Sequence, residues 1–417
     1  MKVAFLLNDL QLSGGVGVVV QHARELALRH GHEVTLVLVR EQEAAPWQFD
    51  GLAHLRVEGL DDARRERFDV AIATWWETVY SLYELDADRY VHFIQSLEDR
   101  FYDALSAERP AAAGVLDFPL SYVTEASWIA QTLRQARPDA PCLLVRNGID
   151  KTVFRSPEQL DVRVGEPLRI VVEGNPQVWF KGVWPAISAV GRMREPRHLT
   201  VVTGDHSKIA PGSADAVVGP ISHDEMAALY GASDVVLKLS RVEGMFGPPL
   251  EGFHMGATCV VAPVTGYDEY IEHGWNGWVV DWDDEAGTAR ALDLLARDRR
   301  LLTFLRANAL ETARTWPTWE QSGVFMAAAL EKIRRDPPPP PYAGARQLAA
   351  DSRMALDRQR LLMHERNEYR RLAKPALRLK RTGAWQRLKW LREHPAMQPV
   401  WTLVRPLTRK LRSKLTG

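Results

Sequence analysis

The chain has 417 residues, of which 46% are hydrophobic and 25% charged, and its formal net charge is zero. This is the composition of an ordinary soluble globular protein, long enough for two or three domains. The first apolar run is short and is interrupted by Asp9, and no window approaches the roughly 18 apolar residues of a membrane span, so neither a signal peptide nor a membrane helix is expected. Cys142 and Cys259 lie far apart without a CxxC motif and are expected to be reduced core residues of a cytosolic protein.

The first predicted domain covers residues 1–160 and alternates strands with helices. KVAFLLNDL reads as a buried strand, SGGVG as a glycine turn, and the next residues as a helix that stops at Gly31. Further strands are expected at EVTLVLV, FDVAIATW, YVHFIQS, LSYVTEA and CLLVRNG. Near-continuous apolar strands that alternate with helices predict a parallel sheet covered on both faces.

A second strand-helix series begins after residues 150–166 and defines a second domain at 161–315. Its expected strands are PLRIVVEG, HLTVVTG, AVVGP, DVVLKLS, TCVVAP and GWVVD, with helices such as SHDEMAALYGA between them. The sequence therefore predicts an α/β protein with two doubly wound, Rossmann-like domains. Ligands bind such sheets at the carboxyl ends of the strands, so we expect the two domains to face each other across a cleft.

The remaining chain reads as a closing helix at 316–335, a Pro-rich linker at 336–342 and a basic helical tail at 343–417. The run PPPPP within the linker is expected to be a stiff, extended spacer. The net charge of zero hides a segregation, because residues 374–417 hold twelve Lys or Arg and one acid, Glu393, and so carry +11.

The tail also places Trp385 and Trp390 at about helical spacing among its basic residues, and Trp401 follows. Basic amphipathic stretches with tryptophan are typical of segments that bind an anionic membrane surface, which is the favoured interpretation here. The same pattern fits a solvated helix that packs its tryptophans on the body of the protein. It also fits a helix that binds a partner or another subunit and, least well, a nucleic-acid site.

The first candidate site is the glycine pair Gly14 and Gly15, between the first strand and the first helix. Backbone N–H groups and a helix N-terminus attract phosphate there, and the alternative to contact with a phosphate or the acceptor is a tight turn that needs glycine. A dinucleotide site is not expected, since the spacing is not GxGxxG and no acid follows the second strand.

The second candidate is Lys181, which precedes Gly182 at an expected helix start in EGNPQVWFKGV. A lysine at a helix N-terminus can face a diphosphate, but a solvated surface lysine has the same signature.

The third candidate is EGMFGPPLE, Glu243 to Glu251, a loop expected between the strand DVVLKLS and a helix that opens at LEGFHMG. Gly244 and Gly247 let backbone N–H groups approach a ligand, and the two prolines fix the loop. Glu251, expected in the first helical turn, could simply favour the helix N-terminus. The same alternative applies to Glu269, expected in the first turn of a helix after Gly266.

Two DxD strings, DAD at 86–88 and DWD at 281–283, mimic a metal motif. Both are expected in polar turns, and we predict no metal site at either.

These motifs together resemble glycosyltransferase family 4, the retaining GT-B glycosyltransferases. The family pattern EGFGxPxLEAMAxGxPVV is similar to EGMFGPPLEGFHMGATCVV, and RNGID, FKGV and TGYDEYIEHGWNGWVV fall in the family's order. The resemblance covers roughly residues 1–335. The run FIQSLEDRFY is similar to a subset of bacterial rhamnosyltransferases that act on surface polysaccharides.

The resemblance implies a role for each candidate residue. Glu243 would face the hydroxyls of the donor sugar, and Glu251 would bind the nucleotide ribose. Lys181 would neutralise the departing diphosphate, and Gly14 and Gly15 would approach the phosphates or the acceptor. The backbone of Gly244, Met245, Phe246 and Gly247 would line the sugar and diphosphate.

The chain departs from the family at two positions. Asn175 stands where the family has an arginine that pairs with the lysine, so Arg241 is expected to compensate or the donor contact differs. Gln95 replaces a histidine found after the fifth strand, and it joins Glu269 as a candidate for contact with the acceptor or sugar.

The resemblance implies transfer of a sugar from a nucleotide-sugar substrate to a glycan or lipid-linked glycan, without a metal or other cofactor. The enzyme is expected in the cytoplasm, peripheral at the inner face of the plasma membrane. A GT-B sugar-nucleotide epimerase, an oxidoreductase using NAD(P), and a non-catalytic glycan-binding or scaffold protein are the alternatives.

Overall fold

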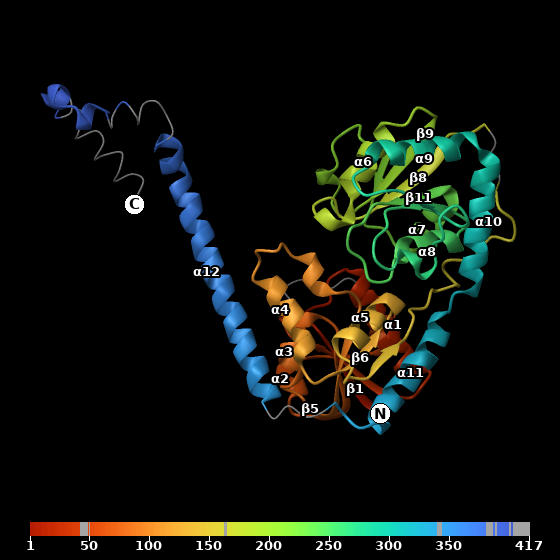
Figure 1. The fold of residues 1–417 in the computed structure, drawn as a ribbon. Helices are drawn as coiled ribbons and strands as arrows, with labels where there is room; N and C mark the ends of the chain where they lie inside the picture. The colour runs from red at the N-terminus through yellow and green to blue at the C-terminus, as the bar shows by residue number, and fades with distance from the viewer. Residues whose placement is uncertain are drawn as a thin grey trace. The chain divides into compact units, whose positions relative to one another are not determined.

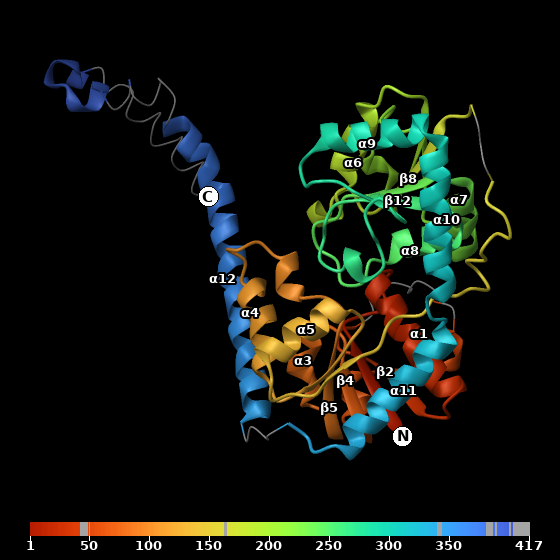
Figure 2. The same cartoon turned by 45° about the vertical axis from the view of Figure 1, so that its right-hand side comes forward.

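The computed structural model describes residues 1–41, 49, 51–161, 165–339, 344–380, 387, 390–399 and 402. It divides into two compact units, Met1–Ala350 and Asp351–Gly417. Figures 1 and 2 show the ribbon from two directions.

The first domain contains a parallel sheet of seven strands among the described residues, red to yellow in Figure 1, with the order β3-β2-β1-β4-β5-β6-β7. The strands are β1 (Lys2–Leu7), β2 (Glu33–Leu38), β3 (Arg56–Gly59), β4 (Arg67–Ala73), β5 (Asp86–Ile94), β6 (Ser121–Thr124) and β7 (Cys142–Leu144). Its helices are α1 (Gly14–Leu28), α2 (Leu60–Ala63), α3 (Trp76–Leu82), α4 (Glu108–Gly114) and α5 (Ser127–Ala136).

The second domain contains a parallel sheet of six strands within the described chain, green to teal in Figure 1, with the order β10-β9-β8-β11-β12-β13. The strands are β8 (Leu168–Glu173), β9 (Arg197–Val202), β10 (Ala216–Val218), β11 (Val235–Lys238), β12 (Thr258–Val261) and β13 (Trp278–Val279). Its helices are α6 (Val183–Gly191), α7 (His223–Ala232), α8 (Gly247–His254), α9 (Glu285–Arg297) and α10 (Arg299–Thr315).

Alternation along β8 shows why the second sheet is covered on both faces. Val171 packs with Tyr230 of α7 and Phe253 of α8 on one face, whereas Ile170 and Val172 pack on the other face. Successive side chains of a strand point to opposite faces, so a strand that is apolar at every position needs helices on both sides. Helices α6 and α9 cover the face that Ile170 and Val172 reach.

Both sheets follow the doubly wound strand order, and the predicted fold class is confirmed. In the first sheet, β1 pairs with β2 on one side and β4 on the other, and β8 likewise lies between β9 and β11. Connections diverge at these two places, so each sheet has a switch point where a ligand can enter between loops. The short strand β3 was not predicted, because RVEG carries little apolar signal.

The chain returns to the first domain after completing the second. Helix α11 (Trp319–Arg335) places Met326, Leu330 and Ile333 in the core formed by α1 and the first sheet. The segment that leads back to the first domain runs beside the segment that leaves it, and the two form a parallel β-bridge between Ile149 and Thr318. A Cβ on Gly148 would lie 2.3 Å from the Trp319 nitrogen, so this crossing requires glycine.

One DxD string is placed differently from the prediction. Asp86 and Asp88 lie in β5 and not in a turn, and Asp88 accepts a hydrogen bond from Arg67 of the neighbouring strand at 2.5 Å. A cross-strand ion pair thus explains this string. Asp281 to Asp283 follow β13 outside the regular elements, as expected.

Helix α12 (Ala345–Lys380) follows the linker, of which residues 340–342 lie outside the described part. Trp390 is 49% exposed, whereas Trp385 and Trp401 lie outside the described residues. Among the helices that the structure describes, none combines the length and the apolar character needed to cross a bilayer.

Candidate active site

An ion pair spans the switch point of the second sheet. Lys181, from the loop after β8, places its Nζ 3.1 and 3.2 Å from the two carboxylate oxygens of Glu243, from the loop after β11. Gly182 follows in the left-handed region (φ 65°), and a Cβ there would lie 2.1 Å from the Leu239 carbonyl oxygen. The glycine therefore brings the two loops together so that the lysine and the carboxylate meet.

A second, deeper pair lies at the strand ends beneath the first. The Nζ of Lys238, the last residue of β11, is 2.7 Å from a carboxylate oxygen of Glu173, the last residue of β8. Burial alone would lower the pKa of Lys238, but the Glu173 carboxylate outweighs burial and raises it. Burial likewise acts to raise the pKa of Glu173, and Lys238 and Lys181 outweigh it and lower it. Both groups are therefore charged, and each satisfies the other.

Glu251 lies close to this pair. Burial raises its pKa to about 7, and the Glu173 carboxylate adds to the effect. Helix α8 begins at Gly247, with the two prolines in its first turn, so Glu251 lies in the second turn. The prediction that Glu251 lies in the first turn was wrong, and capping of the helix N-terminus does not explain it. Pro248 and Pro249 can occupy the first turn because no intrahelical partner is needed for their missing N–H groups.

In the first domain, the glycine pair also lies inside a helix. Helix α1 begins at Gly14, where a separate glycine turn was expected, and its N-cap Ser13 accepts a hydrogen bond from the Val16 N–H. Gln95, after β5, donates its side-chain N–H to the Gly15 carbonyl oxygen at 3.2 Å. The loops after β1 and β5 are thus joined at the carboxyl edge of the first sheet.

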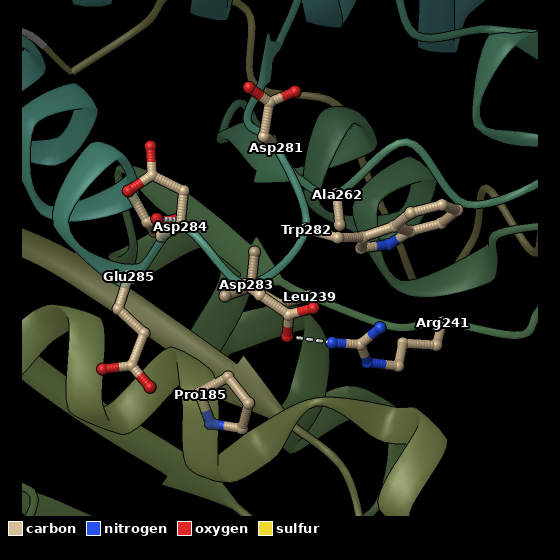
Figure 3. Close-up of a pocket in the computed structure, with 10 residues that line it drawn as sticks. Pro185, Leu239, Arg241, Ala262, Asp281, Trp282, Asp283, Asp284 and Glu285 are labelled. Atoms are coloured by element: carbon tan, nitrogen blue, oxygen red, sulfur yellow. Dashed lines mark hydrogen bonds and ion pairs between the residues drawn. The ribbon is translucent and has the colours of Figure 1, made fainter.

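The two residues expected to replace the family arginine are directed elsewhere. The side-chain oxygen of Asn175 accepts a hydrogen bond from the Gln177 N–H at 2.9 Å, which closes its own turn. Arg241 forms an ion pair with Asp283 and does not join the Lys181–Glu243 pair. Figure 3 shows this ion pair in a pocket at the ends of β11, β12 and β13. The pocket is lined by Pro185, Leu239, Arg241, Ala262, Asp281, Trp282, Asp283, Asp284, Glu285 and Thr288.

Glu269 connects the two domains. It lies in a short 3-10 turn (Tyr267–Glu269) and not in the α-helix that was expected. Its Oε1 accepts hydrogen bonds from the Ser127 N–H at 2.6 Å, the Ser127 hydroxyl at 2.5 Å and the Trp128 N–H at 3.1 Å. Arg146 approaches its other oxygen at 3.6 Å. Glu269 therefore caps α5, a helix of the opposite domain.

The sequence interpretation missed a buried polar group behind this contact. Glu125, directly after β6, is 5% exposed, and its two oxygens accept hydrogen bonds from the Asn147 side chain at 2.6 Å and the Met245 N–H at 3.0 Å. Asn147 in turn lies 3.4 Å from His22 of α1. The available signal was a carboxylate immediately after a strand, at the edge where ligands bind.

Burial of these groups predicts how the free energy of unfolding depends on pH. Burial raises the pKa of Glu125 to about 8, whereas it lowers the pKa of His22 and His254 to about 4 and that of His92 to about 3. Below pH 6.5 the three histidines bind protons only when unfolded, so their contribution to stability rises with pH. Above pH 6.5 Glu125 keeps a proton that the unfolded chain has released, so its contribution to stability falls by about 1.4 kcal/mol per pH unit until pH 8, and Glu251 adds to the fall up to about pH 7.

Urea unfolding at pH 6.5 and pH 8 checks this prediction. Glu125→Gln removes the titration and is expected to flatten the fall by about 2 kcal/mol over this range. An equal fall in the wild-type protein and the variant would contradict the assignment.

Among the residues that the structure describes, no three His, Cys, Asp or Glu side chains gather closely enough to hold a metal ion.

Comparison with known proteins finds a family match within the second domain. Residues 167–298 match the family described as "Glycosyl transferases group 1". The chain is 32% identical over 119 residues to D-inositol 3-phosphate glycosyltransferase 1 of Catenulispora acidiphila, and the match covers 28% of this chain and 28% of that relative.

Solved structures with the same fold cover both domains. Sucrose-phosphate synthase from Thermosynechococcus elongatus superposes with a TM-score of 0.65 at 15% identity, over 80% of this chain and 99% of that one. Anabaena HepE, solved in complex with UDP and glucose, superposes with a TM-score of 0.64 at 16% identity, over 80% of this chain and 100% of its own. The fold is the two-domain GT-B fold.

Proposed function

We propose that this protein is a retaining glycosyltransferase of family 4 that transfers a sugar from a nucleotide-sugar donor to a glycan or lipid-linked glycan. The observation that carries the proposal is the Lys181–Glu243 ion pair at the switch point of the second sheet, within the matched residues 167–298. We further propose a place for the enzyme in the synthesis of a bacterial surface polysaccharide.

The donor would lie over the carboxyl ends of β8 and β11. Lys181 would turn to the diphosphate, Glu243 to the sugar hydroxyls, and Glu251 to the ribose. The backbone from Gly244 to Gly247 would line the sugar and diphosphate. That Anabaena HepE was solved with UDP and glucose supports a nucleotide-sugar donor for this fold.

The charges fit a departing nucleoside diphosphate. As the bond between the sugar's anomeric carbon and the diphosphate breaks, negative charge develops on the leaving oxygen. The Lys181 ammonium group and the N-terminus of α6, which begins two residues later, can stabilise that charge in place before the reaction. The acceptor hydroxyl oxygen then bonds to the anomeric carbon with retention, and its proton passes to the departing diphosphate oxygen. We propose that the enzyme needs neither a metal nor another cofactor.

The acceptor would approach from the first domain, past Gly14, Gly15 and Gln95. Aromatic rings from both domains support a saccharide acceptor. Phe101 after β5 contacts Phe180 beside Lys181, with ring centroids 5.0 Å apart. Phe180 contacts Trp179, which is 57% exposed. Amphipathic rings at a site's edge suit ligands with both apolar and hydroxyl faces.

A thermal-shift screen over UDP-, GDP-, dTDP- and ADP-sugars tests the donor proposal. A ligand at a hundredfold its dissociation constant stabilises the folded state by about 2.7 kcal/mol, so one donor is expected to raise the melting temperature. The donor found would then be assayed for release of its diphosphate and for the anomeric configuration of the product. Absence of a shift with every donor would contradict the proposal.

Product analysis separates the alternatives. An epimerase would convert the donor sugar without an acceptor, and a non-catalytic glycan-binding protein would bind without turnover. Asn175 in place of a basic residue keeps the second alternative worth testing, because Lys181 is left without the family's arginine partner.

Deletion of residues 374–417 is expected to release the protein from membranes. We propose that this segment, with its charge of +11, holds the enzyme at the inner face of the plasma membrane, in the cytoplasm. Each basic residue near an anionic surface contributes about 1 kcal/mol, so flotation with anionic vesicles should fall from most of the protein to background.

Vesicles without anionic lipid provide the control for charge. The full chain is expected to float with them weakly, and increasingly weakly with anionic vesicles as salt is raised. Equal flotation of the full and the truncated chain would refute membrane binding by the tail.

A further inference from the structure

The segment from Glu125 to Trp128, between β6 and α5, exchanges hydrogen bonds with the second domain in both directions. Glu125 accepts one from the Met245 N–H at 3.0 Å, and the Trp128 indole N–H donates one to the Gly244 carbonyl oxygen at 3.0 Å. In the other direction, Glu269 of the second domain accepts hydrogen bonds from the first N–H groups of α5. The loop that carries Glu243 is thus held by two neighbouring groups of the opposite domain.

Glu125 is anchored from behind. Its second oxygen bonds to the side-chain amide of Asn147. The backbone carbonyl oxygen of Asn147 accepts a hydrogen bond from the Trp316 indole N–H at 3.0 Å. Asn147 is 5% exposed and His22 is fully buried, so this side of Glu125 is a fixed polar wall. The Met245 N–H is consequently held at a defined position relative to the first sheet.

Burying a carboxyl in this space is energetically unfavourable. An apolar side chain would pack there without the cost of removing a carboxyl from water, so packing alone does not explain Glu125. What the carboxyl adds is two polar oxygens, one that accepts the backbone N–H of one domain and one that bonds to an amide of the other. That backbone N–H belongs to the residue two positions after Glu243.

We propose that Glu125 is a positioning residue that holds the Glu243–Gly247 loop against the first domain, in the geometry in which Glu243 reaches the donor sugar. The effect of this role on turnover rests on the proposed transfer reaction. The hydrogen bonds of Glu125 with Met245 and Asn147, here called the latch, are present in the protein without substrate. The latch is complete only when the two domains are in contact, so it couples closure of the domains to the position of Glu243.

Protonation of Glu125 governs the latch. Glu243, itself paired with Lys181, is the charged group that acts on Glu125 among the described residues, and His22 behind Asn147 is neutral because burial lowers its pKa to about 4. Burial raises the pKa of Glu125 to about 8, so it is neutral at pH 7. Above pH 8 Glu125 carries a negative charge that burial between the domains disfavours, and the Glu243 carboxylate adds to this effect, so the contact weakens.

Three variants test the proposal. Glu125→Ala removes both acceptors. Glu125→Gln keeps the shape and the neutral state, because the Asn147 amide can turn over so that its oxygen accepts from the new N–H. The control, Asp293→Asn, changes another buried carboxyl that accepts N–H groups from Arg194 and Glu195, within the second domain alone.

The first readout is hydrogen–deuterium exchange of the peptide that contains Met245, in the full chain without substrate. Glu125→Ala is expected to speed exchange there about tenfold to a hundredfold, the size of effect expected when a buried hydrogen bond is lost. Glu125→Gln and Asp293→Asn are expected to stay within threefold of the wild-type protein. Unchanged exchange in a folded Glu125→Ala protein would overturn the proposal. If Glu125→Ala fails to fold, faster exchange at Met245 in the wild-type protein above pH 8, absent in Glu125→Gln, decides the question.

The second readout is the turnover of the donor found in the thermal-shift screen, measured from pH 6 to pH 10. Glu125→Ala is expected to lower kcat about tenfold to a hundredfold with little change in the donor KM. Glu125→Gln should retain kcat at pH 7 and lose the fall above pH 8. Wild-type kcat in Glu125→Ala would overturn the role in turnover. Absence of turnover in the wild-type protein would count against the proposed function, and the exchange experiment would still judge the latch.

Discussion

Replacing Glu243 by alanine is expected to lower the rate of sugar transfer at least about a hundredfold while leaving the fold intact. The Glu243 side chain is 11% exposed, its carboxylate pairs with Lys181 at the switch point, and the residue lies in a loop outside the strands and helices. Its loss leaves Lys181 without a partner and removes a carboxylate from the proposed sugar site. Initial rates with the identified donor, together with the melting temperature, measure the two effects separately.

Two further variants sharpen this experiment. Glu311→Ala removes a carboxylate that is 61% exposed on α10 and should leave turnover unchanged. Glu251→Ala should mainly raise the donor KM, because its proposed contact is with the ribose in the ground state and the transition state alike. Wild-type turnover in Glu243→Ala would show that the site is assigned wrongly.

Replacing Gly244 by alanine is expected to prevent the two domains from meeting as they do in this structure. A Cβ at this position would lie 1.6 Å from the carbonyl oxygen of Gln95 in the opposite domain. Neither backbone can yield by that distance without separating the loops, so turnover should fall about a hundredfold, as when reacting groups are misplaced by about 1 Å.

The thermal stability of each domain distinguishes this effect from misfolding. Gly244 precedes α8, and the added Cβ would clash with the other domain and not within its own, so the melting temperature should change by only a few degrees. A matched substitution in the same domain, Gly191→Ala at the end of α6, has no atom within 4 Å of the added Cβ and should retain its turnover. Full activity in Gly244→Ala would mean that turnover does not require this contact.

The fold could be predicted because each strand carries its own apolar signal. KVAFLL and LRIVVE are buried almost throughout, and their alternation with helices fixed the parallel arrangement. The exceptions are local. RVEG forms β3 through hydrogen bonds to β2 despite three polar or small residues, and Asp86 begins a strand because Arg67 of β4 provides a partner for its backbone.

The candidate site could be predicted only in its individual residues. Lys181 and Glu243 stand 62 positions apart in the chain, and the sheet order brings them together. The direction of a side chain depends on its tertiary partners, which explains why Arg241 was expected beside Glu243 and is instead paired with Asp283. Glu125 escaped notice because a lone carboxylate after a strand has no distinctive spacing.

The return of the chain to its first domain has a consequence for synthesis on the ribosome. The core around α1 is completed by Met326, Leu330 and Ile333 of α11, which emerge roughly 180 residues after the outgoing segment at Ile149. At a translation rate of about 5 to 20 residues per second, the apolar face of α1 stays exposed for roughly 10 to 40 seconds before α11 can pack on it. The nascent first domain is therefore a natural client for chaperones, and a chain cut before α11 should aggregate although its seven strands are all present.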